Sequence, residues 1–590
     1  MPPKVPYIPE SAPFSREQRL WLNGFFAGLF AFEETAGAKS APTKPAIPLT
    51  ILFGSQTGTA QNLANRIARE AGTRGFSARV LDAAAHATID WKAETNFLVV
   101  TSTYGDGDMP DNAQVFWAWL NSDAGNVVAH VSFSVLALGD TNYAEFCAAG
   151  KKIDARLEQL GAERIHPRVD CDVDYEAKAR EWMEGVLTVL APATGDAAPT
   201  TGHGAPTAVT ASSQGSGSVY DRNNPFPARL LANRRLNAEG SEKETRHYEI
   251  SLEGSGLSYE AGDALGLIPD NCPELVADLL QALGFDGEEA VPCPKGTELS
   301  LRLALATCYD ITKPGVEFLQ AIARHNGVLA ALLAPDRKED LKAWLWARDI
   351  VDVLRETPEA RFQPAEFVGL LKKIAPRLYS IASSPKAHPG QVHLTVSTVR
   401  YESNGRARKG VGSTFLADRV RSEDPIRVFV QPSHGFKPPE KGDTPMIMVG
   451  PGTGVAPFRS FLHERRAAAA RGRNWLFFGE QRASTDFYYR DELEQMLSEG
   501  HLTRLSTAFS RDQPEKIYVQ RRLLEHAAEL WSWLQDGAHF YVCGDASRMA
   551  KDVDAALHQA IAQAGGLGPD GAAVYVNQLR AEKRYQRDVY

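Results

Sequence analysis

The alternation of buried strands and helices that begins near residue 48 is the feature that most limits how this chain folds. Residues 49–53 predict a buried strand, and a short polar turn leads from it into a predicted helix over 61–72. Two further apolar runs, 97–100 and 131–138, also end in polar loops. Strands and helices that alternate in this way predict a parallel, doubly wound sheet, which binds ligands at the carboxyl ends of its strands.

Three loops at those strand ends predict the first binding site. The first loop opens a helix N-terminus, where hydroxyls and backbone N–H groups freed by glycines can hold a phosphate. It contains no Lys, unlike a nucleoside-triphosphate P-loop, so a mononucleotide such as FMN fits better. The other two loops each carry a tyrosine whose ring could stack on a flavin. The residues expected to bind FMN are Ser55, Gln56, Thr57, Gly58, Thr59, Ala60, Ser102, Thr103, Tyr104, Gly105, Gly107, Leu138, Gly139, Asp140, Tyr143, Phe146 and Cys147.

A second site is predicted in the segment 377–384, which combines a cation, an aromatic ring and several hydroxyls between two prolines. Arg377 can neutralise a pyrophosphate, Tyr379 can cover one flavin face, and Ser380 can donate a hydrogen bond to a ring nitrogen. Taken alone, such residues beside a strand are more often ordinary surface residues. The glycine-rich turn at 410–416 offers further amides and hydroxyls to phosphate. Together the two segments favour FAD.

A third site is predicted where residues 446–457 form a strand, a glycine-rich turn and a helix, the order that a dinucleotide site requires. Downstream, Ser510, Arg511 and Lys516 could surround a 2′-phosphate, and Tyr518 could stack on adenine. Taken alone, this stretch is more often an ordinary solvated basic loop. As a cofactor site, its charges favour NADPH over NADH.

Composition narrows the class of protein. The net charge of -9 argues against nucleic acid as the main partner and suits docking onto a basic protein surface. The 6 cysteines are scattered without a CxxC pair, so the sequence predicts neither a disulfide framework nor a metal or iron–sulfur site. This cysteine usage fits a reducing compartment, and we expect a cytoplasmic protein.

Two segments of unusual composition frame the first sheet. Residues 1–46 are rich in Pro and Ala but contain an apolar stretch at 14–32 that predicts a short helix. This helix would either fold back on its own domain or serve docking or oligomerisation. The candidate membrane segment within it, residues 21–32, is about half of the roughly 20 residues that span a bilayer, and no signal-peptide features precede it, so we expect no membrane segment. Residues 192–219 contain mainly Gly, Ala, Ser, Thr and Pro and predict a flexible linker.

The three loops of the first site resemble the FMN domain of the diflavin reductases, the family of cytochrome P450 reductase, nitric oxide synthase reductase domains and the sulfite reductase flavoprotein. The resemblance runs from about residue 48 to the C-terminus, with several motifs in the family's order. It implies an N-terminal extension at 1–46, a flavodoxin-like FMN domain at 47–191, the linker at 192–219 and a ferredoxin-NADP reductase-like module. That module would comprise an antiparallel β-barrel FAD domain at 220–440, with a helical connecting insertion at about 273–371, and a Rossmann-like NADP domain at 441–590.

The resemblance also implies which residues bind the cofactors of that module. The FAD set comprises Thr312, Arg377, Leu378, Tyr379, Ser380, Thr395, Val396, Ser397, Tyr401, Gly410, Val411, Gly412, Ser413 and Tyr590. From the residues alone, a helix N-cap is an equally good interpretation of Thr312. The NADP set comprises Gly452, Thr453, Ser510, Arg511, Lys516, Tyr518, Gln520 and Asp552.

By the same resemblance, electrons flow from NADPH to FAD, then to FMN, and finally to an external metal centre. Ser380, Cys543 and Asp588 would assemble the hydride-transfer site, and Tyr590 would cover the FAD ring until the nicotinamide arrives. The linker would let the FMN domain visit both FAD and the acceptor. The intact catalytic set argues against a non-catalytic flavin-binding scaffold.

Three segments indicate which electron acceptor the chain reduces. The C-terminal residues 579–590, the segment 138–141 and the N-terminal apolar stretch look most like the sulfite reductase flavoprotein. That resemblance implies a sirohaem and iron–sulfur partner that reduces sulfite to sulfide. Tyr104 and the pair Val411 and Gly412 depart from that subfamily, so a stand-alone reductase for a P450 or a nitrate-reducing partner stays open. A rim of acidic residues beside the FMN loops could dock a basic partner or could be merely solvated: Asp106, Asp108, Asp111, Asp140 and Glu145.

Overall fold

The structure is a computed structural model that describes residues 46–55, 58–104, 107–140, 145–172, 175–191, 219–294, 296–334, 336–433 and 435–590. The predicted N-terminal helix and all but the last residue of the predicted linker lie outside these ranges. So do four of the residues expected to bind FMN, namely Gln56, Thr57, Gly105 and Tyr143.

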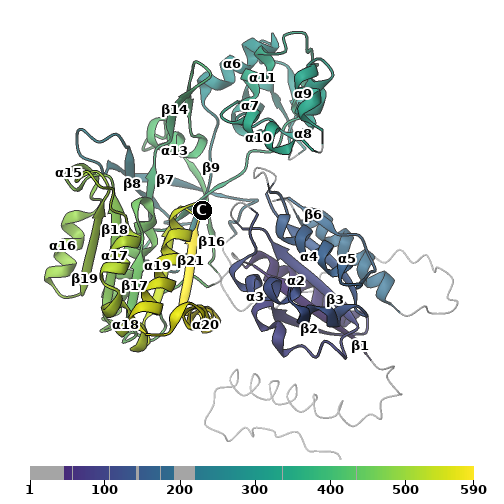
Figure 1. Ribbon diagram of the computed structural model, residues 1–590. Coiled ribbons are helices and arrows are strands. Elements are labelled where there is room, and N and C mark those ends of the chain that lie inside the picture. Colours follow the sequence, from purple (N-terminus) through teal and green to yellow (C-terminus); the bar gives the residue numbers. More distant parts are fainter. Residues whose placement is uncertain are drawn as a thin grey trace, which may run out of the picture.

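The N-terminal part of the described chain forms a parallel, doubly wound sheet, as the sequence predicted. Its strands follow the order β2-β1-β3-β4-β5, with β6 also paired to β4. Apolar side chains pack on both faces, with α2 and α5 over one and α3 and α4 over the other (Figure 1). The strands are β1 (Ile47–Gly54), β2 (Phe76–Asp82), β3 (Asn96–Ser102), β4 (Ser132–Leu138), β5 (Glu163–Arg164) and β6 (Val169–Cys171), and the helices are α2 (Thr59–Thr73), α3 (Gln114–Leu120), α4 (Ala148–Gln159) and α5 (Glu176–Leu190).

An antiparallel sheet in the order β12-β9-β16-β7-β8-β13 follows. A bridge between Ile381 and Leu394 joins its two edge strands, so the sheet closes into a barrel. The strand β9 begins at Ala264, just after Gly262, which has φ +104 and lies against the carbonyl of Phe436. The strands are β7 (Phe226–Arg235), β8 (Thr245–Ser251), β9 (Ala264–Ile268), β12 (Arg377–Ser380), β13 (Gln391–Ser397) and β16 (Ile426–Gln431).

Between β9 and β12 the chain leaves the barrel and forms a mainly helical unit with its own apolar core, seen at the top of Figure 1. Its elements are α6 (Pro273–Leu283), β10 (Ala290–Pro292), β11 (Glu298–Ser300), α7 (Leu301–Thr307), α8 (Val316–Ala323), α9 (Gly327–Leu332), α10 (Lys338–Leu345), α11 (Ile350–Arg355) and α12 (Pro364–Gly369). The hairpin β14 (Arg400–Ser403) and β15 (Arg406–Lys409) then leads to the short helix α13 (Val411–Thr414).

The C-terminal part of the chain forms a second parallel sheet in the order β19-β18-β17-β20-β21. Chain ends commonly fray, yet β21 pairs with β20 from Tyr585 to Val589 and so fixes the last residues in place. The strands are β17 (Met446–Val449), β18 (Asn474–Glu480), β19 (Arg504–Phe509), β20 (His539–Gly544) and β21 (Tyr585–Val589). The helices are α14 (Val455–Ala467), α15 (Ala483–Asp486), α16 (Arg490–Ser498), α17 (Val519–Glu525), α18 (Ala527–Gln535), α19 (Met549–Ala564) and α20 (Gly568–Ala581). Among the described residues, no helix has both the length and the apolar character needed to cross a membrane.

Candidate flavin and nucleotide sites

The described residues at the end of β1 and the start of α2 suit a phosphate group. Gly58 has φ 78 and directly precedes α2, and the N-terminus of a helix favours an anion. The Ala60 N–H donates to Ser55 Oγ at 3.3 Å, and the Ser55 N–H donates to the side-chain oxygen of Asn112 at 2.9 Å. A Cβ on Gly54 would lie 2.6 Å from Thr101 Oγ1, so only glycine fits there. These residues suit FMN, and the supporting Asn112 was not among the predicted residues.

The carboxyl ends of β3 and β4 lie on the same edge of the sheet as this site, because β1 pairs with β3 and β3 pairs with β4. Thr103 Oγ1 accepts a hydrogen bond from the Ala149 N–H at 3.2 Å, which ties the second loop to the start of α4. The Cys147 thiol is fully buried and lies 3.5 Å from the carbonyls of Ala137 and Cys171. Cys147 would therefore contact a ligand through its backbone.

Tyr104 lies at the seam between the first sheet and the C-terminal strand β21. Its hydroxyl donates to the Val589 carbonyl at 2.9 Å, and its ring packs against the core of the C-terminal sheet. Burial raises the pKa of the Tyr104 hydroxyl, which favours its neutral, hydrogen-bonding form. Next to it, the Arg587 Nε donates to Asp111 Oδ2 at 2.9 Å, and Arg587 Nη2 bonds the other carboxylate oxygen. Asp111 of the acidic rim is thus engaged within the chain.

The barrel strand β12 presents the predicted FAD residues. Arg377 lies 3.8 Å from the Asp310 carboxylate, and the Thr312 hydroxyl donates to Asp310 at 2.6 Å. Thr312 does not cap a helix, because α8 starts after Gly315. A Cβ on Gly412 would lie 2.6 Å from the Tyr379 hydroxyl, so this glycine lets the turn approach β12 closely.

Burial raises the pKa of Tyr379 to about 12, so its phenol stays neutral at physiological pH. Because Gly412 lies in α13, its contact with the Tyr379 hydroxyl places β12 next to this helix, an arrangement that suits a flavin dinucleotide. Asp310, which approaches Arg377, was missed by the sequence analysis because nothing in its local pattern distinguishes it from a turn residue.

Three residues from distant parts of the chain converge on one carboxylate. Ser380 Oγ donates to Asp588 Oδ2 at 2.7 Å, and Cys543 Sγ lies 3.9 Å from the same oxygen. They come from β12, β20 and β21, so the cluster exists only where the barrel meets the C-terminal sheet. Burial raises the pKa of Asp588, although the two hydrogen bonds oppose this, and burial also raises the pKa of the Cys543 thiol. Both groups are thereby biased toward their protonated forms.

The terminal residue is held by three hydrogen bonds. Tyr590 donates its backbone N–H to the Gly544 carbonyl at 3.0 Å and accepts from the Ala546 N–H at 3.1 Å. Its hydroxyl lies 2.8 Å from Thr453 Oγ1, on the turn that the sequence assigned to NADP. With 62% of its surface exposed, the Tyr590 side chain has room to move while its backbone stays fixed.

The predicted NADP residues surround the carboxyl edge of the C-terminal sheet. A Cβ on Gly454 would lie 2.1 Å from the Cys543 carbonyl, so the glycine-rich turn packs directly on the end of β20. Gln520 Nε2 donates to Asp552 at 3.2 Å, and Tyr518 is 47% exposed at the start of α17. Arg511 bonds Glu242 at 2.6 Å.

Arg482 brings a further cation to that edge. Its guanidinium donates to the Arg511 carbonyl at 3.1 Å, so it lies beside the loop expected to hold the 2′-phosphate. Arg482 was not among the predicted residues because it lies 29 residues from Arg511 in the chain. Lys516 makes no contact that would fix its side chain to another described residue.

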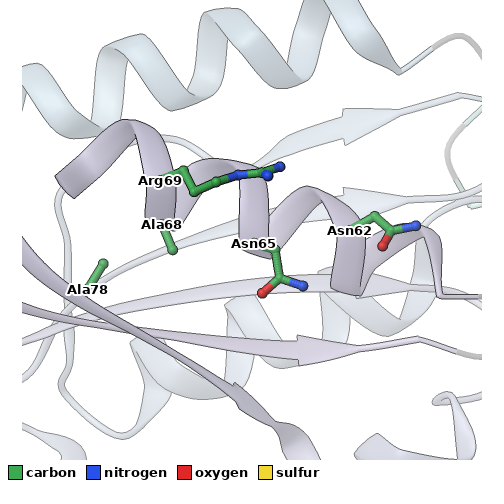
Figure 2. Close-up of a pocket in the computed structure, with 5 residues that line it drawn as sticks. All are labelled: Asn62, Asn65, Ala68, Arg69 and Ala78. Atoms are coloured by element: carbon green, nitrogen blue, oxygen red, sulfur yellow. The ribbon is translucent and has the colours of Figure 1, made fainter. Parts of the chain in front are cut away.

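Two hollows accompany these sites. A cavity of 540 Å³ lies between the first sheet and the C-terminal sheet, and Tyr104, Asp108, Arg587 and Tyr590 are among its lining residues. Figure 2 shows a second hollow on the face of α2, lined by Asn62, Asn65, Ala68, Arg69 and Ala78. None of the residues around the second hollow belongs to the predicted cofactor sets.

Three family models match the chain in order. The model for flavodoxin matches residues 51–182, that for the FAD binding domain matches 218–415, and that for the oxidoreductase NAD-binding domain matches 448–555. Among curated proteins, the chain is similar to the sulfite reductase (NADPH) flavoprotein alpha-component of Bacillus subtilis, at 46% identity over 98% of this chain and 96% of the relative. The proteins of the same name from Vibrio parahaemolyticus and Vibrio cholerae are 42% and 43% identical, over 98% and 97% of this chain and 93% of each relative.

Proposed function

Because the chain belongs to the family of the sulfite reductase (NADPH) flavoprotein alpha-component, we propose that it carries electrons from NADPH through FAD and FMN to a haemoprotein partner. The order of the three matched domains supports this path, since the flavodoxin, FAD-binding and NAD-binding parts follow one another along the chain. When bound, FAD accepts a hydride and FMN releases electrons one at a time, which is the chemistry that the flavins supply.

One observation carries the proposal, namely the cluster of Ser380, Cys543 and Asp588 where the barrel meets the C-terminal sheet. Ser380 orients the Asp588 carboxyl by donating a hydrogen bond at 2.7 Å. The buried Cys543 fills the space beside them without an ionised thiolate, because burial raises its pKa. A mostly buried cluster of this kind helps to keep water from the path of a hydride.

Tyr590 fits the role of a movable cover over this cluster. It follows Asp588 by two residues, its backbone is fixed to Gly544, and its hydroxyl bonds Thr453 on the nucleotide-binding turn. A nicotinamide that displaces the ring would have to break only the bond to Thr453. A neutral hydrogen bond of that kind contributes about 1 kcal/mol, so the displacement costs little.

The remaining site residues are assigned by the geometry of their loops. We propose that the loops after β1, β3 and β4 hold FMN, that β12 and the turn before α13 hold FAD, and that the carboxyl edge of the C-terminal sheet holds NADPH. Arg511 and Arg482 would pair with the 2′-phosphate, and Arg511 would then exchange its bond to Glu242 for the cofactor.

The partner that fits this role is the sirohaem and iron–sulfur subunit of sulfite reductase, which reduces sulfite to sulfide. We propose a cytoplasmic location, supported by the fact that all 6 cysteines are free thiols. The N-terminal segment would serve assembly into an oligomer.

The proposal is tested by the purified chain itself. We expect equal amounts of FMN and FAD, and NADPH-dependent reduction of cytochrome c that is lost when FMN is removed and restored when FMN is added back. Asp588→Asn should slow NADPH oxidation while both flavins stay bound. A preparation that binds both flavins but does not oxidise NADPH would overturn the proposal.

A further inference from the structure

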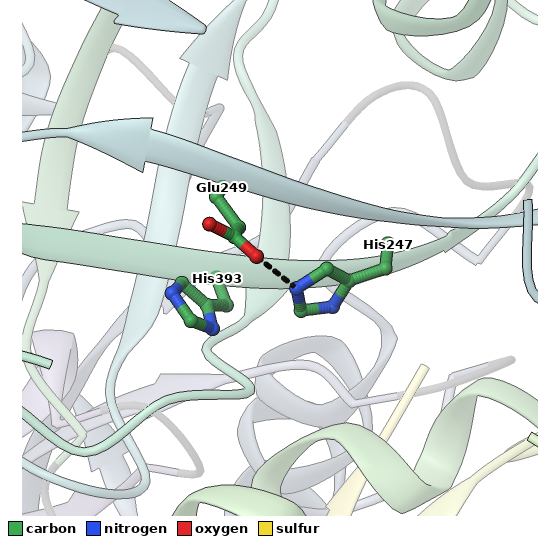
Figure 3. A group of neighbouring side chains, drawn as sticks. All are labelled: His247, Glu249 and His393. Carbon is green, nitrogen blue, oxygen red and sulfur yellow. Dashed lines mark hydrogen bonds and ion pairs between the residues drawn. The ribbon is translucent and has the colours of Figure 1, made fainter. Parts of the chain in front are cut away.

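Two histidines and a glutamate lie together on the outer face of the barrel, outside the predicted cofactor sets. His247 and Glu249 are two residues apart on β8, so their side chains share one face of the sheet. His393 on β13 is the direct cross-strand partner of Glu249. Figure 3 shows the three side chains turned toward one another, with the carboxylate between the two rings.

The spacing of their ligand atoms is close to that of a metal site. The atoms that each residue can offer all lie within 4.8 Å of one another, and His247 Nε2 is 3.3 Å from Glu249 Oε1. Ligands about 2.1 Å from a tetrahedral Zn²⁺ are separated by roughly 3.4 Å. One pair therefore already has the required separation, and the His393 ring lies close enough to complete the site by a small rotation about its side-chain bonds.

We infer that His247, Glu249 and His393 form a binding site for a divalent transition-metal cation that clamps β8 to β13. Two imidazoles and one carboxylate are a ligand set that suits Zn²⁺ and Fe²⁺, whereas Mg²⁺ and Ca²⁺ prefer oxygen ligands alone. Both histidines are buried, while the Glu249 side chain is 35% exposed. The cation would therefore enter from the side of Glu249.

Surrounding groups hold the ligands in place, as the outer shell of a metal site does. His247 Nδ1 lies 2.9 Å from the Tyr489 hydroxyl, which itself lies 2.6 Å from Thr395 Oγ1. That contact orients the ring and leaves Nε2 facing Glu249. Gln391 lies 3.4 Å from His393 Nε2 and could provide a fourth, oxygen ligand.

Arg459 is a positively charged neighbour of the proposed metal site. Arg459 Nη1 lies 3.3 Å from His393 Nδ1, and a metal-bound imidazole would give up this contact. Arg459 keeps its bond to the Ala382 carbonyl at 2.7 Å and its ion pair with Glu492 at 2.9 Å. Glu492 therefore balances part of the Arg459 charge, and the Glu249 carboxylate adds a negative charge within the site itself.

The direct test is calorimetric titration of Zn²⁺ into the metal-free chain with both flavins bound. We expect one tight equivalent of Zn²⁺ and a higher unfolding temperature when it is bound. His393→Gln and Glu249→Gln should each weaken that binding by about tenfold or more, as the loss of a direct ligand should exceed the 10- to 100-fold cost of an outer-shell change. Glu249→Gln is the safer variant for folding because that side chain is partly exposed.

His558→Gln is a matched control for Zn²⁺ binding elsewhere on the chain. His558 lies 3.7 Å from Asp554 on α19, and such a half-buried pair can also attract Zn²⁺. His558→Gln should leave the tight equivalent intact. Absence of tight Zn²⁺ binding, or equal binding by the wild type and Glu249→Gln, would overturn the inference. Since the readout is binding, it does not depend on NADPH oxidation or on the identity of the acceptor.

Discussion

Replacing Asp111 by Asn should release the FMN-binding part of the chain from the C-terminal strand. Asp111 forms a two-point ion pair with Arg587, and both side chains are mostly buried, with 24% and 11% of their surface exposed. The variant keeps the size of the side chain but removes the charge that faces Arg587. Burial lowers the pKa of the Arg587 guanidinium, so the loss of a paired carboxylate leaves a buried charge with less compensation.

The expected magnitude follows from the burial of the pair. Truncating one partner of a buried, hydrogen-bonded charge pair across an interface costs about 2–5 kcal/mol. Because this pair retains some contact with solvent, we take the lower end, about 2 kcal/mol, which shifts the docking equilibrium roughly 30-fold. Tyr104→Phe, which removes only the bond to the Val589 carbonyl, should cost about 1 kcal/mol.

Small-angle X-ray scattering of the oxidised protein measures this shift directly. Asp111→Asn should increase the radius of gyration, and Tyr104→Phe should do so less. Stopped-flow traces should show an unchanged first phase of NADPH oxidation and a slower second phase of internal electron transfer.

The control is Glu163→Gln, an exposed charge at the start of β5 and thus at the opposite end of the same sheet. It should change neither measurement. If Asp111→Asn scatters like the wild type at both low and high salt, the ion pair does not hold the two parts together.

Three further outcomes follow from the sites. Ser380→Ala should slow NADPH oxidation on the order of 10- to 100-fold at unchanged flavin content, because it removes the donor that orients Asp588; an unchanged rate would contradict this role. Gly412→Ala should lower FAD content, since its Cβ would lie 2.6 Å from the Tyr379 hydroxyl, whereas Gly369→Ala, in open space, should not. The third outcome concerns Glu492. Burial alone would raise the pKa of this carboxylate, but the hydrogen bond from His463 and the charge of Arg459 lower it to about 2. This carboxylate therefore stabilises the fold above pH about 4.5 and loses its effect as the pH falls toward 2, so Glu492→Gln should flatten the acid limb of an unfolding-temperature profile.

The parallel sheets could be predicted because their strands carry continuous apolar runs. Residues 49–53 and 446–449 are buried on both faces, and this pattern is visible without any tertiary information. The glycine-rich segments could also be recognised in the sequence. The structure gives the reason for three of their glycines, Gly54, Gly412 and Gly454, because a Cβ at each position would clash with a neighbour. The resemblance to the diflavin reductases predicted that Ser380 and Asp588 lie together, although they are 208 residues apart in the chain.

What the sequence did not show depends on contacts between distant segments. Asn112 and Asp310 support predicted residues from loops with no distinctive local pattern. Tyr104 was expected to stack on a flavin, and only the structure reveals that its hydroxyl bonds Val589, 485 residues away. The cluster of His247, Glu249 and His393 likewise depends on the register of β8 with β13, which the spacing of the three residues in the sequence does not fix.

Sulfide formation by the purified chain and its sirohaem partner tests the central claim most directly. With NADPH as the sole reductant, sulfite should be converted to sulfide in step with NADPH oxidation, and Asp588→Asn should abolish most of this flux. Intact reduction of cytochrome c without any sulfide, in the presence of an active haemoprotein, would contradict the account and favour a reductase for another acceptor.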